Sequence, residues 1–267
     1  MSPPIITLLT DFGTADTYVG QMKGVILGIF PEARIVDLTH ETPPQDVEAA
    51  AYALDAAISA FPPGTVHVVV VDPGVGSERR LLMAEADGQR LVAPDNGVLE
   101  PVLQRASSVR VHELRERWFQ REPRSDTFHG RDVIAPAAAH WAKGTSLEKF
   151  GPPLQGARVP LPLGDPTVEA DGIQGAVRSI DHFGNAITNI PVTLIPEDRR
   201  SSAIIRIGTQ SFTGLRSCYS DVEPEECLVL VSSSGHLEIA QRNGNAAAVQ
   251  GISRGMKVAV SWNVADS

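Results

Sequence analysis

Apolar residues in the first half of the chain alternate between short dense runs and longer amphipathic stretches. The runs Ile5–Thr10, Ala33–Leu38 and Thr65–Val71 are rich in β-branched and aliphatic residues, which is typical of buried strands. Between them, Thr17–Phe30 and Asp46–Phe61 place apolar residues three and four positions apart, the spacing of one helical face. Strands that alternate with helices predict a mainly parallel sheet with helices on both faces.

Two further signals follow in this half. Leu81–Ala86 and Arg90–Ala93 flank Asp87-Gly88, a dipeptide that favours a hairpin turn. Asp132–Trp141 returns to the helical spacing and predicts another helix.

The pattern changes near Pro160–Asp171, which is rich in proline and acidic residues and poor in periodic apolar ones. We therefore divide the chain into an α/β domain at residues 1–160, a linker at 161–171 and a smaller domain at 172–267. Short strand-like runs separated by turn residues predict that the second domain is all-β and barrel-like or a small sandwich. These runs are Gly175–Ile180, Ala203–Ile207, Leu228–Val231, Leu237–Ala240 and Met256–Trp262.

Composition narrows the class of protein. With 267 residues and 42% hydrophobic residues, the chain can bury a sizeable core. Its net charge of −9 opposes the basic surface expected of a nucleic-acid binder. We find neither a run long enough to span a membrane nor a signal peptide, so we expect a cytoplasmic protein. The cysteines Cys218 and Cys227 lack zinc-ligand spacing, and we expect them to be free thiols.

An acidic residue at the end of the third predicted strand is the leading candidate for chemistry. Asp72 opens the turn Pro73–Ser77, and the carboxyl ends of parallel strands are where α/β sheets place their sites. Arg79 follows across this glycine-rich turn, and His129 stands where the last predicted helix begins. The turn lacks the Gly-Lys-Ser/Thr ending of a phosphate-binding loop, so nucleoside triphosphate binding is excluded. The three side chains form a candidate catalytic set.

Other polar residues in this half leave alternatives open. Asp11 and Asp95 either cap local turns or contact a ligand. A metal-dependent hydrolase could use His40, Asp72, Asp95 and His129, although their spacing matches no named metal motif. His67, inside an apolar strand, is expected to be a core histidine.

Two polar segments interrupt the strand pattern of the second half. They are residues 180–185, which contain Asp181, Phe183 and Asn185, and residues 232–235, which contain Ser233. Each is either a plain loop or part of a site in which an aromatic ring and an amide recognise a planar base.

Several uncommon segments occur in a fixed order along nearly the whole chain: TDFGTADTYVGQMKGVI, DLTHETPPQDVEAAA, VVVDPGVGSERR, APDNG, FHGRDVIAP, IDHFGNAITNI, YSDV and SSSGHLEIA. On these segments the chain resembles the adenosine-forming S-adenosyl-L-methionine (SAM) hydrolases, or SAM hydroxide adenosyltransferases, which are related to fluorinase and chlorinase. The resemblance implies a larger α/β domain, a smaller C-terminal β-barrel, and a homotrimer with sites at subunit interfaces. It implies neither a metal nor a cofactor.

The resemblance also implies an activity and a role for each candidate. Water or hydroxide would attack C5′ of SAM and give adenosine and L-methionine; a SAM- or adenosine-binding protein without turnover is the alternative outside enzymes. By resemblance, the water is handled by Asp72, Arg79 and His129, and the ribose hydroxyls are held by Asp11. The methionine ammonium lies near Asp16 and Asp181, and the methionine carboxylate contacts Ser233. Adenine contacts Phe183 and Asn185.

Four positions depart from the relatives. Gly130 stands where the fluorinase has a serine that contacts fluoride. Asp72 stands where the halogenases have residues suited to a halide pocket. Both differences favour hydrolysis over attack by a halide. Ser234 replaces a fluorinase arginine near the substrate carboxylate, and Arg242 replaces an asparagine that is more usual in the family.

Overall fold

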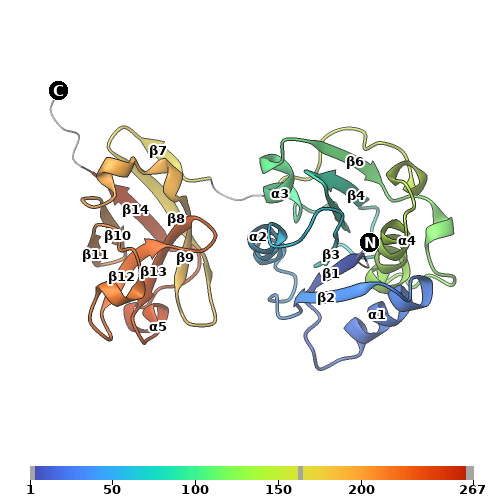
Figure 1. Cartoon of the computed structure of the whole chain (residues 1–267), viewed down its shortest axis with the longest axis horizontal. Helices are drawn as coiled ribbons and strands as arrows, with labels where there is room; N and C mark the ends of the chain where they lie inside the picture. The colour runs from blue at the N-terminus through green and yellow to red at the C-terminus, as the bar shows by residue number, and fades with distance from the viewer. Residues whose placement is uncertain (1–3, 162–164, 263–267) are drawn as a thin grey trace. The chain divides into compact units, whose positions relative to one another are not determined.

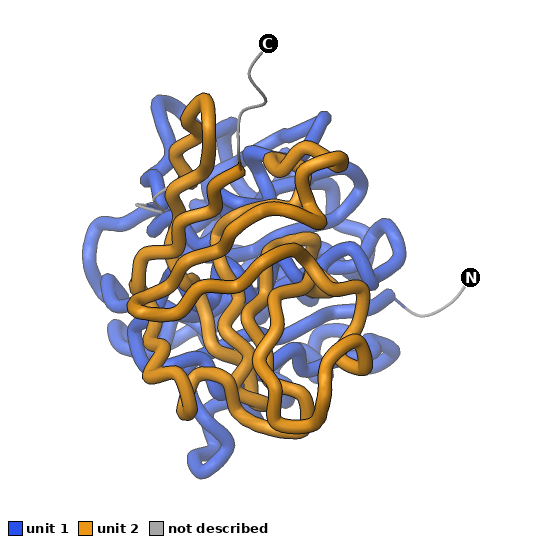
Figure 2. Tube along the Cα trace, turned by 90° about the vertical axis from the view of Figure 1, so that its left-hand side faces the viewer, with its two compact units in different colours: residues 1–162 blue, residues 163–267 orange. Residues whose placement is uncertain are grey.

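The computed structural model describes residues 4–161 and 165–262. The chain forms two compact units, residues 1–162 and 163–267 (Figure 2).

Unit 1 is built on a six-stranded sheet in the order β2-β1-β3-β5-β4-β6 (Figure 1). The first four of these strands are parallel, and β4 and β6 run antiparallel to their neighbours. The predicted mainly parallel sheet and the predicted hairpin are both confirmed. The strands are β1 (Ile5–Thr10), β2 (Arg34–Thr39), β3 (Val66–Val70), β4 (Leu81–Ala86), β5 (Gln89–Pro94) and β6 (Val109–Glu113).

Helices cover both faces of this sheet, as Figure 1 shows. They are α1 (Tyr18–Ile29), α2 (Val47–Ile58), α3 (Glu100–Arg105) and α4 (Ala135–Ala142). Successive β3 side chains point to opposite faces. Val68 and Val70 therefore join the apolar core that contains α1 and α4, whereas Val69 joins the core that contains α2 and α3. This alternation explains why β3 is apolar apart from His67, and it places the residues after β3 at the edge between two packed layers.

His67 on β3 is a core histidine, as its place in an apolar run predicts. Its side chain is fully buried, and its Nδ1 shares a hydrogen bond of 2.8 Å with the hydroxyl of Thr7. Burial lowers the pKa of His67 to about 4, so the imidazole is neutral at physiological pH.

Unit 2 contains eight antiparallel strands and confirms the predicted barrel-like β fold. Seven strands follow the order β11-β10-β14-β8-β9-β13-β12, and β7 pairs with β8. The strands are β7 (Thr167–Glu169), β8 (Gly172–Ile180), β9 (Ala186–Pro191), β10 (Ile204–Ile207), β11 (Gln210–Thr213), β12 (Cys227–Val231), β13 (His236–Gln241) and β14 (Lys257–Ser261). Helix α5 (Ala246–Gln250) follows β13, and both cysteines are free thiols.

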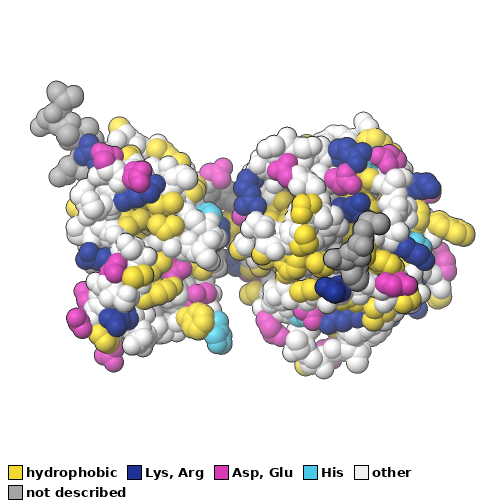
Figure 3. Space-filling view, viewed as in Figure 1, with side chains coloured by type: hydrophobic (Ala, Val, Ile, Leu, Met, Phe, Trp, Pro, Cys, Tyr) yellow, Lys and Arg dark blue, Asp and Glu magenta, His cyan; other side chains and the backbone are white. Residues whose placement is uncertain are grey.

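Short helical turns complete the connections. They are η1 (Arg117–Phe119), η3 (Leu147–Phe150), η4 (Val192–Leu194), η5 (Glu197–Arg199) and η6 (Tyr219–Asp221), besides the π-helical turn η2 (Gly130–Ile134). No helix among the described residues has the length and apolar character needed to cross a membrane. Figure 3 shows acidic and basic side chains interspersed on the visible face of each unit, which gives that face no continuous basic surface among the described residues.

Candidate active site

The turn after β3 folds Arg79 back onto Asp72. The amide of Val75 donates to the carbonyl of Asp72, and the Ser77 hydroxyl accepts the amide of Arg79. A Cβ on Gly74 would lie 3.0 Å from Cδ of Arg79, so glycine leaves the room that this close approach needs. The glycine-rich turn therefore positions an ion pair between residues seven positions apart.

The structure brings Asp72, Arg79 and His129 together. Nε of Arg79 donates to both carboxylate oxygens of Asp72, at 2.6 and 2.8 Å, and its Nη2 also pairs with Oδ2. The same Nη2 lies 3.2 Å from Nδ1 of His129. Because the side chains of Asp72 and Arg79 are only 5% and 10% exposed, water screens the pair weakly.

These contacts determine which ring nitrogen of His129 carries the hydrogen. A guanidinium can only donate, so Nδ1 accepts the hydrogen bond from Arg79 and Nε2 carries the hydrogen. Burial lowers the pKa of His129, and the charges of Arg79 and Arg124 lower it further, against the opposite effect of Asp72 and Asp126. The buried Nε2 has no hydrogen-bond partner among the described residues. His129 thus has an N–H donor that no described residue uses.

His129 immediately precedes η2, which runs into α4. The predicted helix is confirmed, but it begins at Gly130 instead of Asp132. Its first turn is a wider π-helical turn, in which the amide of Ala135 donates to the carbonyl of Gly130, five residues back. Pro136 has no amide hydrogen to offer the carbonyl of Asp132, which instead accepts the amide of Arg121 at 2.8 Å. The proline therefore shapes the helix start that holds His129.

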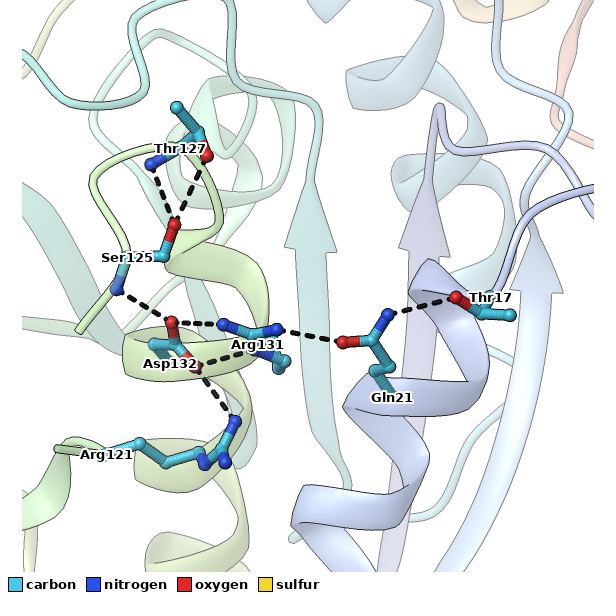
Figure 4. A network of polar contacts seen from close by, with 7 residues as sticks. All are labelled: Thr17, Gln21, Arg121, Ser125, Thr127, Arg131 and Asp132. Carbon is cyan, nitrogen blue, oxygen red and sulfur yellow. Dashed lines mark hydrogen bonds and ion pairs between the residues drawn. The ribbon is translucent and has the colours of Figure 1, made fainter. Parts of the chain in front are cut away.

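Asp132 anchors this helix start, a role that no pattern in the sequence predicted. Its fully buried carboxylate accepts hydrogen bonds from Arg131, Arg121 and the amide of Ser125 (Figure 4). Burial alone would raise the pKa of Asp132, but these hydrogen bonds and charges outweigh it and lower the pKa. Arg131 also donates to Gln21 on α1 at 2.8 Å, which ties the helix start to α1.

A cavity of about 370 Å³ lies at the strand ends of unit 1 and contains the predicted residues Asp11, Asp72 and His129 in its lining. Its volume is in the range of small-molecule sites. Phe12, Tyr18 and Phe128 form one wall, with ring centroids 5.3 to 5.7 Å apart. A lining that combines aromatic rings with carboxylates suits a ligand with an apolar part and a polar or cationic part.

Asp11 and Asp16 differ in position. Asp11 is half-buried in the cavity lining, and its Oδ2 accepts the amide of Gln45 at 2.8 Å, so it both holds a turn and faces the cavity. Asp16 is exposed and is not part of that lining. At Gly130 a Cβ would lie 3.0 Å from Val70, so a serine there would require this part of the wall to shift.

In unit 2, one turn holds three predicted residues together. Oδ1 of Asp181 accepts the amides of Phe183 and Asn185, at 2.9 and 2.8 Å, and Oδ2 accepts the Asn185 side chain at 3.0 Å. Asp181 therefore shapes the turn that leaves the Phe183 ring 72% exposed. Ser233 is exposed in the turn before β13.

The two departures in unit 2 have local partners. Ser234 is a hydrogen-bond partner of the Ser232 hydroxyl at 2.9 Å. Arg242 donates to the carbonyl of Val222 at 2.6 Å. Both side chains thus stabilise the loops around β13.

The alternative metal cluster does not assemble. Asp95 accepts hydrogen bonds from Arg80 at 2.7 Å and from the amide of Val159 at 3.0 Å. His40 bonds through Nδ1 to the Thr10 hydroxyl, and its Nε2 lies 3.0 Å from Asp37. Within residues 4–161 and 165–262 no three His, Cys, Asp or Glu side chains are grouped as metal ligands. Asp95 and His40 therefore have structural partners of their own.

An α/β unit with a polar site at its strand ends, followed by an antiparallel barrel-like unit, defines a two-domain enzyme for a small molecule. Models of the N-terminal and C-terminal domains of SAM hydroxide adenosyltransferase match residues 6–151 and 175–259. The chain belongs to the SAM hydroxide adenosyltransferase family.

Comparison with individual proteins agrees with this membership. The chain is 38% identical to the (R)-S-adenosyl-L-methionine hydrolase of Salinispora tropica, over 98% of this chain and 99% of the relative. The fluorinase of Actinopolyspora mzabensis is more distant, at 29% identity over 97% and 98% of the two chains. The crystal structure of an uncharacterised conserved protein from Thermotoga maritima superposes with a TM-score of 0.89 at 37% identity, covering 96% of this chain and all of that one.

Proposed function

We propose that this protein hydrolyses SAM to adenosine and L-methionine by attack of water or hydroxide on C5′. The family membership and the hydrolase relative support this reaction. The observation that carries it is the contact of Asp72, Arg79 and His129 at the edge of a cavity of suitable size.

The chemistry asks for water positioning more than for acid catalysis. As the oxygen bonds to C5′, the bond from C5′ to sulfur breaks and its electron pair leaves with sulfur, which becomes a neutral thioether. A neutral leaving group needs no general acid, so the enzyme must align the oxygen opposite sulfur and accommodate the proton it loses.

We assign these tasks to the three grouped side chains. The carboxylate of Asp72 accepts a hydrogen bond from the water, while the guanidinium of Arg79 and the Nε2 hydrogen of His129 donate to its oxygen as charge develops. Because Asp72 is paired with Arg79, it orients the water instead of removing its proton alone. No step in this scheme calls on a metal.

The remaining candidates are proposed to bind the substrate. Asp11 faces the cavity and is assigned to the ribose hydroxyls. Asp16 and Asp181 are assigned to the methionine ammonium, Ser233 to its carboxylate, and Phe183 and Asn185 to adenine. The Asp181 turn supports the adenine assignment, because it presents an exposed aromatic ring next to a side-chain amide.

We further propose a cytoplasmic homotrimer in which the domain at residues 1–160 supplies the water and ribose contacts and the domain at 172–267 of a neighbouring subunit supplies the adenine and methionine contacts. The family resemblance and the division of candidates between two domains support this arrangement. Light scattering should give three times the chain mass of 28.5 kDa. A fully active monomer would contradict it.

Incubation of the purified protein with SAM, followed by chromatography and mass spectrometry, tests the reaction. We expect adenosine and methionine in equal amounts and in large excess over enzyme, with turnover unchanged after chelation. Binding without turnover would leave only a SAM- or adenosine-binding protein. Turnover lost on chelation and restored by a metal would support the metal-dependent alternative.

A further inference from the structure

A second cavity of about 290 Å³ lies in unit 1, on the other side of the catalytic set. Asp72 lines the first cavity and Arg79 lines the second, whereas His129 lines both. The ion pair and the imidazole are therefore part of the wall between the two cavities.

The two cavities differ in chemistry. The first has an aromatic wall, but none of the residues lining the second is aromatic apart from His129. The second is lined largely by charged side chains, among them Glu78, Arg80, Glu113, Arg115, Arg124 and Asp126. Such a lining is suited to water and to ions of either sign and poorly suited to an adenine ring.

We propose that the second cavity is the route by which water reaches the catalytic set and the proton leaves it while substrate fills the first cavity. This inference rests on the proposed function. Each hydrolysis consumes one water and releases one proton, because the hydroxyl of adenosine keeps only one of the two hydrogens. A nucleoside in the first cavity covers the side of Asp72 and His129 that lines this cavity. Water and protons must then exchange with solvent on the side of the second cavity.

The state of His129 supports this route. Its Nε2 is buried and has no hydrogen-bond partner among the described residues, so its hydrogen lacks the small acceptor, such as a water, that a buried N–H group needs. Arg124 and Asp126 line the second cavity and also act on the pKa of His129, in opposite directions. Charges at the second cavity are thus electrostatically coupled to the imidazole.

Filling the second cavity tests the route. Gln120 is half-buried in its lining, and its side chain makes no hydrogen bond to the described residues, so Gln120→Trp should narrow the cavity without breaking a contact. Gln120→Leu is the matched control, because it removes the amide at similar size. Glu78→Trp is a second filling variant at an exposed position of the same lining.

We expect the single-turnover rate of adenosine formation at saturating SAM to fall at least about tenfold in Gln120→Trp and Glu78→Trp, and to stay within about twofold in Gln120→Leu. Adenosine affinity and melting temperature should match those of the wild type in all three variants. A general structural disturbance would change both quantities. If the wild type is active and both tryptophan variants form adenosine at the wild-type rate, the proposed route is wrong. A wild type that forms no adenosine would overturn the proposed function and this inference with it.

Discussion

Nε of Arg79 is shared between the two carboxylate oxygens of Asp72, at 2.6 and 2.8 Å. This contact leaves Nη2 to reach both Oδ2 of Asp72 and Nδ1 of His129. One planar guanidinium thus fixes the carboxylate and the imidazole at once, and it fixes the tautomer of the imidazole. The geometry of Arg79, beyond its charge, is what we expect catalysis to depend on.

Arg79→Lys tests this dependence. Lysine keeps the positive charge but cannot hold both partners in one plane, so turnover should fall by about 10- to 100-fold. Adenosine affinity, measured by calorimetry, should change little because Arg79 does not line the first cavity. Arg110→Lys, at an exposed ion pair with Glu85, is the control and should stay close to wild type. Full activity in Arg79→Lys would show that charge alone suffices.

Arg124→Gln should change the pH dependence of turnover. The charged groups that act on His129 are Arg79, Arg124, Asp72 and Asp126, and burial together with the two arginines lowers its pKa from 6.5. The neutral imidazole is the proposed active form, so activity falls as pH drops through this lowered pKa. Removing the charge of Arg124 raises the pKa, and the acidic limb of the profile should move to higher pH.

Asp126→Asn is the matched variant of opposite sign. The charge of Asp126 raises the pKa of His129, so its removal lowers the pKa and should move the acidic limb to lower pH. Rates on the alkaline plateau should be similar in both variants and in wild type. Profiles of kcat against pH that shift in the same direction in both variants would contradict control by His129.

Asp11→Ala should mainly weaken binding. Losing hydrogen bonds from two ribose hydroxyls to a carboxylate should cost about 1.5 to 3 kcal/mol in adenosine affinity. Adenine alone lacks the ribose and should bind equally well to wild type and variant. Asp11→Asn retains an oxygen for the amide of Gln45 and serves as the control for the turn. Equal adenosine affinity in wild type and Asp11→Ala would refute the ribose assignment.

The sequence predicted those features that depend on local pattern. The largely apolar run of β3 placed Asp72 at a strand end, and the glycine-rich turn brought Arg79 within reach. The pattern missed β9, whose buried positions include Thr188. The hydroxyl of Thr188 is satisfied by the carbonyl of Leu237 on a strand far along the chain, which no local spacing reveals.

Asp132 was missed for the same physical reason. A buried carboxylate is stable only with its donors, and two of them, Arg121 and the amide of Ser125, reach it because the preceding loop folds back on the helix. Its immediate neighbour Arg131 was the one local signal of an acid-base pair. Burial of polar residues is set by tertiary contacts, so patterns of apolar residues predict the sheet better than they predict what orders the site.

Labelled water decides which atom attacks C5′. If Asp72 orients water, a single turnover in ¹⁸O-water should place the label on the 5′ oxygen of adenosine. If the Asp72 carboxylate itself attacked, an ester to C5′ would form, and hydrolysis at its carbonyl would give unlabelled adenosine and a labelled enzyme carboxylate. The pairing of both carboxylate oxygens with Arg79 opposes the second course, because charge-assisted hydrogen bonds to the guanidinium make the carboxylate a weaker nucleophile. Mass spectrometry of adenosine and of the peptide that contains Asp72 reads both outcomes, and unlabelled single-turnover adenosine would rule out direct attack by water.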